Sequence, residues 1–153
     1  MLIKLSKPEI YFFSEEIKFV LPHKKKIREW ISYAIKKEKR KFQSFNFIFC
    51  SDSYLIDLNK HYLQHNFYTD IITFDNSESV DLLSGDFYIS IDRIKENSRI
   101  YSVPVRKELY RVIIHGVLHL IGYNDKTSVE AEVMKQKEDY YLSLLPKFIP
   151  GKI

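Results

Sequence analysis

The chain has 153 residues, of which 45% are hydrophobic and 29% charged with a net charge of +4; this excludes a disordered or fibrous protein and predicts a single globular domain over residues 1–153. Its one cysteine, Cys50, excludes an internal disulfide framework and predicts a reducing compartment, the cytoplasm. No apolar run approaches the ~18 residues of a membrane span, and the four glycines form no phosphate-binding loop, so we expect neither a membrane partner nor a nucleotide cofactor.

The first half of the chain predicts alternating strands and helices. A short apolar strand over residues 10–13 precedes an amphipathic helix over residues 24–40, whose apolar side chains recur at helical spacing: Ile27, Trp30, Ile31, Ala34 and Ile35. Alternating phenylalanines predict a strand over residues 44–50. Ser51 or Asp52 then caps a second helix.

The helix predicted over residues 24–40 is strongly basic. Nine of the 24 lysines and arginines lie between residues 24 and 41, against two acids, Glu29 and Glu38. Such a concentration is typical of a surface that binds a polyanion. A solvated helix face has the same pattern and is the alternative.

The second half of the chain predicts two strands, over residues 71–74 and 85–92. Three helices are predicted, over residues 92–101, 104–120 and 127–145. The last of them begins with a capping box formed by Thr127 and Glu130. The alternation of elements predicts an α/β or α+β fold, a small mixed sheet with helices packed on it.

The most informative segment is the end of the helix predicted over residues 104–120. His115 and His119 are four residues apart, so they project from one face of the helix and lie close enough to share a metal ion. Gly122 can end the helix and reverse the chain, which returns Asp125 to the same face as a third ligand. Three protein ligands leave one position open, as in catalytic zinc sites. Two histidines in a core without a metal are the alternative, which their desolvation cost disfavours.

Neighbouring residues refine this interpretation. Gly116 stands where HExxH zinc proteases have the glutamate that deprotonates water, and its small size is expected to leave room beside the metal. Glu108 is interpreted as an acid behind the site or on the surface rather than as a ligand. His61 and His65 have the same spacing but no third ligand, and we interpret them as a helix end and loop. Two histidines and an aspartate also suit Fe(II) or another divalent metal.

The sequence HGVLHLIGYND at residues 115–125 resembles the signature of the bacterial YbeY-type rRNA maturation factors, which are single-strand-specific metallo-endoribonucleases. The likeness covers about residues 45–145 and includes shorter blocks at Leu58-Asn59, residues 68–74, Gly85-Asp86 and Glu108-Leu109. It implies a zinc-dependent nuclease that acts in 16S rRNA 3′-end maturation and ribosome quality control, with the small ribosomal subunit as its partner. It also implies a mixed sheet with the histidine helix at the centre.

Two positions depart from that family pattern. Asp125 replaces a third histidine, and a carboxylate can serve as the ligand there with a changed charge. Leu63 stands where the family usually has an arginine implicated in catalysis. Lys60, His61 and Lys126 are the alternatives that could supply the missing positive charge, and the sequence does not choose among them.

The leading hypothesis is therefore an RNA phosphodiester hydrolase with zinc held by His115, His119 and Asp125. The basic helix would gather the RNA backbone. Asp70, which precedes an apolar strand, is a candidate for the catalytic base or for support of the site, and a plain loop acid is equally consistent. The alternatives are a non-catalytic metal- and RNA-binding assembly factor, which Leu63 favours, and a zincin-like metalloprotease that lacks its usual base.

Overall fold

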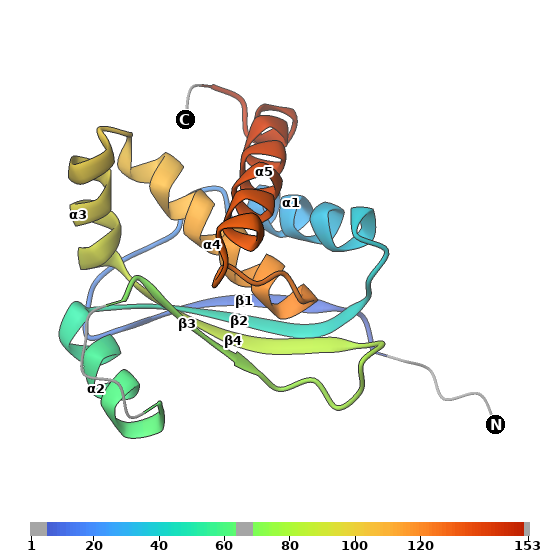
Figure 1. Ribbon diagram of the computed structural model, residues 1–153, viewed down its shortest axis with the longest axis horizontal. Helices are drawn as coiled ribbons and strands as arrows, with labels where there is room; N and C mark the ends of the chain where they lie inside the picture. Colours follow the sequence, from blue (N-terminus) through green and yellow to red (C-terminus); the bar gives the residue numbers. More distant parts are fainter. Residues whose placement is uncertain (1–5, 64–68, 152–153) are drawn as a thin grey trace.

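The computed structural model describes residues 6–63 and 69–151, which form a four-stranded sheet covered by helices (Figure 1). The strands are β1 (Glu9–Glu15), β2 (Phe42–Cys50), β3 (Ile71–Asp75) and β4 (Leu83–Ser90). The helices are α1 (Lys24–Lys37), α2 (Asp52–Tyr62), α3 (Ile91–Tyr101), α4 (Val105–Ile121), α5 (Ser128–Leu144) and the short 3-10 turn η1 (Leu145–Lys147). The predicted α/β class is confirmed. Within the described part of the chain, no helix combines the length and apolar character needed to cross a membrane.

The sheet is mixed, with the strand order β1-β2-β4-β3. β1 and β4 run parallel to β2 on either side of it, and β3 runs antiparallel to β4 at the edge. The alternating phenylalanines of β2 place Phe45 and Phe47 on one fully buried face. There Phe47 stacks on Phe87 of β4, with ring centroids 4.5 Å apart. Strand periodicity thus fixes which face of the sheet receives the helices.

The helices divide between the two faces of the sheet. α1, α4 and α5 lie on one side, and α2 lies on the other (Figure 1). α4 contributes most to the core, with five side chains that have no exposed surface: Tyr110, Ile113, Ile114, Val117 and Leu118. Trp30 of α1 is also fully buried and donates its indole N–H to the Tyr141 carbonyl of α5 at 2.9 Å. Each such side chain stabilises the fold by ~1.5–3 kcal/mol, so α4 is held firmly against the sheet.

Several strand and helix ends differ from the sequence prediction by one to three residues, and two of them have a clear local cause. β4 ends at Ser90 rather than residue 92, because the Ser90 hydroxyl accepts from the Arg93 amide and caps α3. α1 ends at Lys37 rather than residue 40, because Lys39 adopts a positive φ of 59° and the Arg40 amide donates back to the Ile35 carbonyl at 3.0 Å. Beside this turn, the Glu38 carboxylate accepts hydrogen bonds from three side chains distant in the sequence, Tyr123, Tyr141 and Lys137. Burial acts to raise the pKa of Glu38, but these hydrogen bonds outweigh burial and lower the pKa. The carboxylate therefore fastens the end of α1 to α5 and to the turn that follows α4.

Candidate metal centre

His115 and His119 lie on the one face of α4 that is not fully buried in the core. Their side chains are 17% and 30% exposed, whereas the helix faces beside them are buried. The two imidazole rings meet edge to face, with centroids 4.5 Å apart. One helical turn thus brings both rings to the same point, as the four-residue spacing predicts.

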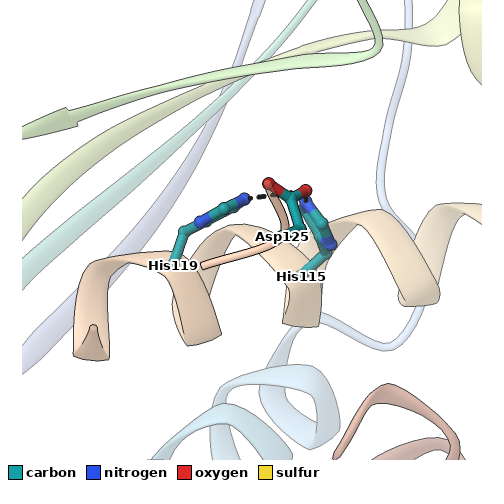
Figure 2. A group of neighbouring side chains, drawn as sticks. All are labelled: His115, His119 and Asp125. Carbon is teal, nitrogen blue, oxygen red and sulfur yellow. Dashed lines mark hydrogen bonds and ion pairs between the residues drawn. The ribbon is translucent and has the colours of Figure 1, made fainter. Parts of the chain in front are cut away.

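A glycine reversal carries Asp125 back over the two histidines. Gly122 adopts a φ of 127°, a region that favours glycine, and its amide donates to the Leu118 carbonyl at 3.1 Å. Asp125 then lies between the rings (Figure 2). Its Oδ2 is 3.5 Å from Nε2 of His115 and 3.3 Å from Nε2 of His119.

These three side chains suit a metal ion. The possible ligand atoms of His115, His119 and Asp125, one from each residue, all lie within 4.8 Å of one another. Among the described residues, this is the one set of three or more histidines, cysteines or acids that lie so close together. Ligands ~2.0 Å from a tetrahedral zinc ion are separated by ~3.3 Å, close to the spacings between Asp125 and the two rings. Two imidazoles and a carboxylate are also ligands that zinc accepts. The donor set and its spacing therefore fit zinc.

The other ring nitrogen of His115 is engaged by a residue that the sequence analysis missed. Glu138 of α5 lies with Oε2 2.6 Å from Nδ1 of His115. Arg111, one turn before His115 on α4, pairs with Glu138 at 3.3 Å. The four-residue spacing of Arg111 from His115 could have identified Arg111, because such pairs share a helix face. Nothing in the sequence links Glu138 to His115, since they are 23 positions apart on different helices.

The histidines lie in a cleft of about 710 Å³ between α4 and the edge strand β3. Asp70, Leu63 and Lys126 also line it. Lys60 and His61 are exposed on α2 and do not line the cleft. Of the three predicted substitutes for the family arginine, the structure thus brings Lys126 alone to the site. His65, and Tyr68 at the start of the block over residues 68–74, lie outside the described part of the chain.

Asp70 and Glu108 both belong to the surroundings of the site. Asp70 accepts a hydrogen bond from the Asn97 amide at 3.4 Å, and Arg111 lies 3.7 Å from its Oδ2. Burial raises the pKa of Asp70, against the opposing effect of the positive charge of Arg111. Glu108 is buried at 2% exposure and paired with Arg111, so it lies behind the site and not on the surface.

Gly116 does not leave room beside the metal, and that expectation was wrong. A Cβ atom at this position would lie 2.6 Å from Cδ1 of Ile71 and 3.0 Å from Cδ1 of Phe87. The space that the missing side chain leaves is therefore occupied by the sheet. Gly116 permits close packing of α4 on β3 and β4.

The sequence of this chain is similar to those of known proteins that share one name. A family model described as "Endoribonuclease YbeY" matches residues 10–146. A protein of Cytophaga hutchinsonii with that name is 50% identical over 135 residues, covering 88% of this chain and 94% of the relative. A protein of the same name from Karelsulcia muelleri is 51% identical over 132 residues, covering 86% of this chain and 93% of the relative.

The fold is also similar to a solved structure. The solution structure of a Thermotoga maritima protein superimposes with a TM-score of 0.66 at 25% sequence identity. The match covers 95% of this chain and 100% of the other. The arrangement of sheet and helices thus occurs in a protein with a clearly diverged sequence.

Proposed function

The chain belongs to the endoribonuclease YbeY family, and from this premise we propose that it is a zinc-dependent, single-strand-specific endoribonuclease acting in 16S rRNA 3′-end maturation and ribosome quality control. Relatives that match most of its length are named endoribonucleases, so the chain is a hydrolase acting on RNA. The observation that carries the proposal is the convergence of His115, His119 and Asp125 in one cleft. The small ribosomal subunit would be the partner, and the cytoplasm, where ribosomes assemble, the location.

The residues that line the cleft would have different roles in the reaction. His115, His119 and Asp125 would hold the zinc ion, which when bound supplies the Lewis acidity that polarises a phosphoryl oxygen and lowers the pKa of water. Asp70 would accept the proton of the attacking oxygen, because it lines the same cleft and burial moves its pKa upward, toward the range suited to a general base. Asn97 and Arg111 would keep its carboxylate in place.

The size of the cleft supports a single-stranded substrate. A volume of about 710 Å³ is that of a site for a drug-sized ligand and so accommodates a few nucleotides. Unpaired nucleotides can turn their bases and phosphates into such a site, whereas the paired bases of a duplex stay stacked on their neighbours. An unpaired segment can therefore enter the cleft and be cut there without the prior opening of base pairs.

The basic end of α1 would guide the RNA backbone toward the cleft. Glu38, directly after α1, accepts a hydrogen bond from the Tyr123 hydroxyl at 2.5 Å, and Tyr123 is two residues before Asp125. The end of α1 is therefore tied to the turn that carries the third proposed ligand. The lysines at this end are exposed: Lys36, Lys37 and Lys39.

Replacing Lys36, Lys37 and Lys39 together by glutamine should weaken RNA binding and leave the fold intact. Each lost phosphate contact should flatten the dependence of log affinity on log salt by ~0.7 for a single strand. Fluorescence anisotropy with a labelled single-stranded RNA at several salt concentrations measures both quantities. An unchanged affinity and slope would show that this part of α1 is only a solvated face.

Lys126→Gln should reduce the rate of RNA cleavage, because Lys126 is the basic side chain that lines the described part of the cleft besides the histidines. A hydrogen bond to a charged group is worth roughly 1.5–3 kcal/mol, so kcat/KM should fall about tenfold to a hundredfold. Lys60→Gln is the matched control, since Lys60 is exposed outside the cleft, and it should cleave like the parent. Equal rates for Lys126→Gln and the parent would remove Lys126 from the mechanism.

The experiment that tests the proposed function is maturation of a ribosomal substrate. Immature small subunits whose 16S rRNA retains its 3′ extension are incubated with the protein, and the RNA ends are mapped. We expect cleavage within the extension, and no cleavage when a complementary oligonucleotide makes that segment double-stranded. Cleavage of the duplex at the same rate, or an extension left intact, would contradict the proposal.

A further inference from the structure

The two ring nitrogens of His115 face different partners. Nε2 lies on the cleft side, 3.5 Å from Oδ2 of Asp125. Nδ1 lies on the α5 side, 2.6 Å from Oε2 of Glu138. Glu138 is 5% exposed, so this contact is nearly screened from water. A buried carboxylate this close to a ring nitrogen accepts a proton from it and does not repel it.

Glu138 is itself held by a cation. Arg111 approaches Oε1 of Glu138 through Nη1 at 3.3 Å, while its other nitrogens bind both carboxylate oxygens of Glu108, with Nε at 3.0 Å. Arg111 also lies 3.7 Å from Asp70. The guanidinium thus offsets the cost of burying these carboxylates, and it holds Glu138 by the carboxylate oxygen that does not contact His115.

We propose that Glu138 is a positioning residue that accepts the Nδ1 proton of His115, and that Arg111 holds the Glu138 carboxylate in place for this task. A proton fixed on Nδ1 leaves the lone pair on Nε2, the nitrogen that faces the cleft. The same hydrogen bond sets the orientation of the ring and raises its strength as a ligand. This inference rests on the proposed zinc centre, because it concerns how one of that centre's ligands is prepared.

A purely structural role for Glu138 makes different predictions. If the carboxylate only fastens α5 to α4 through Arg111, then removing it would lower stability without changing the proton position on His115. Glu108 provides the comparison for this alternative. It is equally buried, at 2% exposure, and paired with the same Arg111. None of its hydrogen bonds or ion pairs involves His115, whereas Glu138 has one with that ring.

The first test compares zinc affinity in Glu138→Gln and Glu108→Gln by competition with a fluorescent chelator at fixed pH. Loss of a hydrogen-bond partner behind a metal ligand costs about 10- to 100-fold in affinity, and we expect this loss for Glu138→Gln. Glu108→Gln should stay within about threefold of the parent, because its carboxylate does not support a ligand directly. Thermal unfolding of the metal-free variants reports whether each still folds.

The second test needs neither zinc nor RNA. In metal-free protein with 15N-labelled histidine, at a pH where the imidazole is neutral, the two nitrogen shifts of His115 report which one carries the proton. We expect the Nδ1–H form in the parent and a shift toward the Nε2–H form in Glu138→Leu. The Glu108→Leu variant should retain the pattern of the parent.

The outcomes separate this inference from the proposed function. A parent that binds zinc, together with Glu138 variants that bind it equally well and keep the same tautomer, overturns the role of Glu138 alone. Equal losses of affinity in Glu138→Gln and Glu108→Gln assign the effect to Arg111 packing and also overturn it. A parent that binds no zinc overturns the proposed centre itself.

Discussion

His115→Ala should lose its zinc and its RNA cleavage together. Zinc sites with four protein ligands bind with roughly 10–16 kcal/mol, or about 3 kcal/mol per ligand, so removing one ligand should weaken binding about a hundredfold or more. His119 and Asp125 alone then hold the ion poorly. Chelator competition measures the affinity, and cleavage of a labelled single-stranded RNA measures the activity.

Asp125 and His61 provide the controls for this prediction. Asp125→Asn keeps the size of the side chain but removes the anionic oxygen, so it should lose zinc as His115→Ala does. Asp125→His should retain zinc, because imidazole also suits the ion. His61→Ala should behave like the parent, since His61 is exposed on α2 outside the cleft. Full cleavage by His115→Ala, or parent-like zinc affinity in Asp125→Asn, would contradict this ligand set.

Gly116→Glu should destabilise the fold and should not create a protease. The substitution would recreate the HExxH spacing, but the new side chain begins 2.6 Å from Ile71 and 3.0 Å from Phe87. It would place an unpaired carboxylate where α4 packs on the sheet, at a cost of about 3–5 kcal/mol. At ~2–4 °C per kcal/mol, the melting temperature should fall by about 10 °C.

Gly116→Ala separates the effect of size from that of charge. Cδ1 of Ile71 is the end of a flexible side chain and can move, and alanine gains about 1 kcal/mol of helix propensity over glycine. Its melting temperature should therefore stay far closer to the parent's than that of Gly116→Glu. A folded Gly116→Glu with the parent's melting temperature would show that α4 packs less closely on the sheet than described.

Local sequence signals predicted most of the elements. The Thr127–Glu130 capping box sets the start of α5, and both of its hydrogen bonds are present. The stop at Gly122 was sufficient to place Asp125 over the histidines, because the spacing and the positive φ act within one turn. In each case the residues that determine the structure are neighbours in the sequence.

Tertiary contacts explain what the sequence could not predict. The attachment of the end of α1 to the rest of the fold depends on Glu38 and its partner Tyr123, 85 positions away. The order of the strands also depends on tertiary contacts, because no residue near β3 in the sequence specifies that this strand pairs antiparallel to β4 at the edge of the sheet. Glu138 approaches His115 because the core packs α5 against α4, with Met134 and Tyr141 buried on that helix. Contacts of this kind become visible only in the folded chain.

The most direct test of the metal-dependent mechanism is a titration of metal-stripped protein with zinc, followed by cleavage of a single-stranded RNA. The arrangement of His115, His119 and Asp125 predicts no cleavage without metal and full activity at one zinc ion per chain. His115→Ala should show no recovery over the same range. Undiminished cleavage by the stripped protein in excess chelator would contradict the account, because the three side chains would then have no part in the reaction.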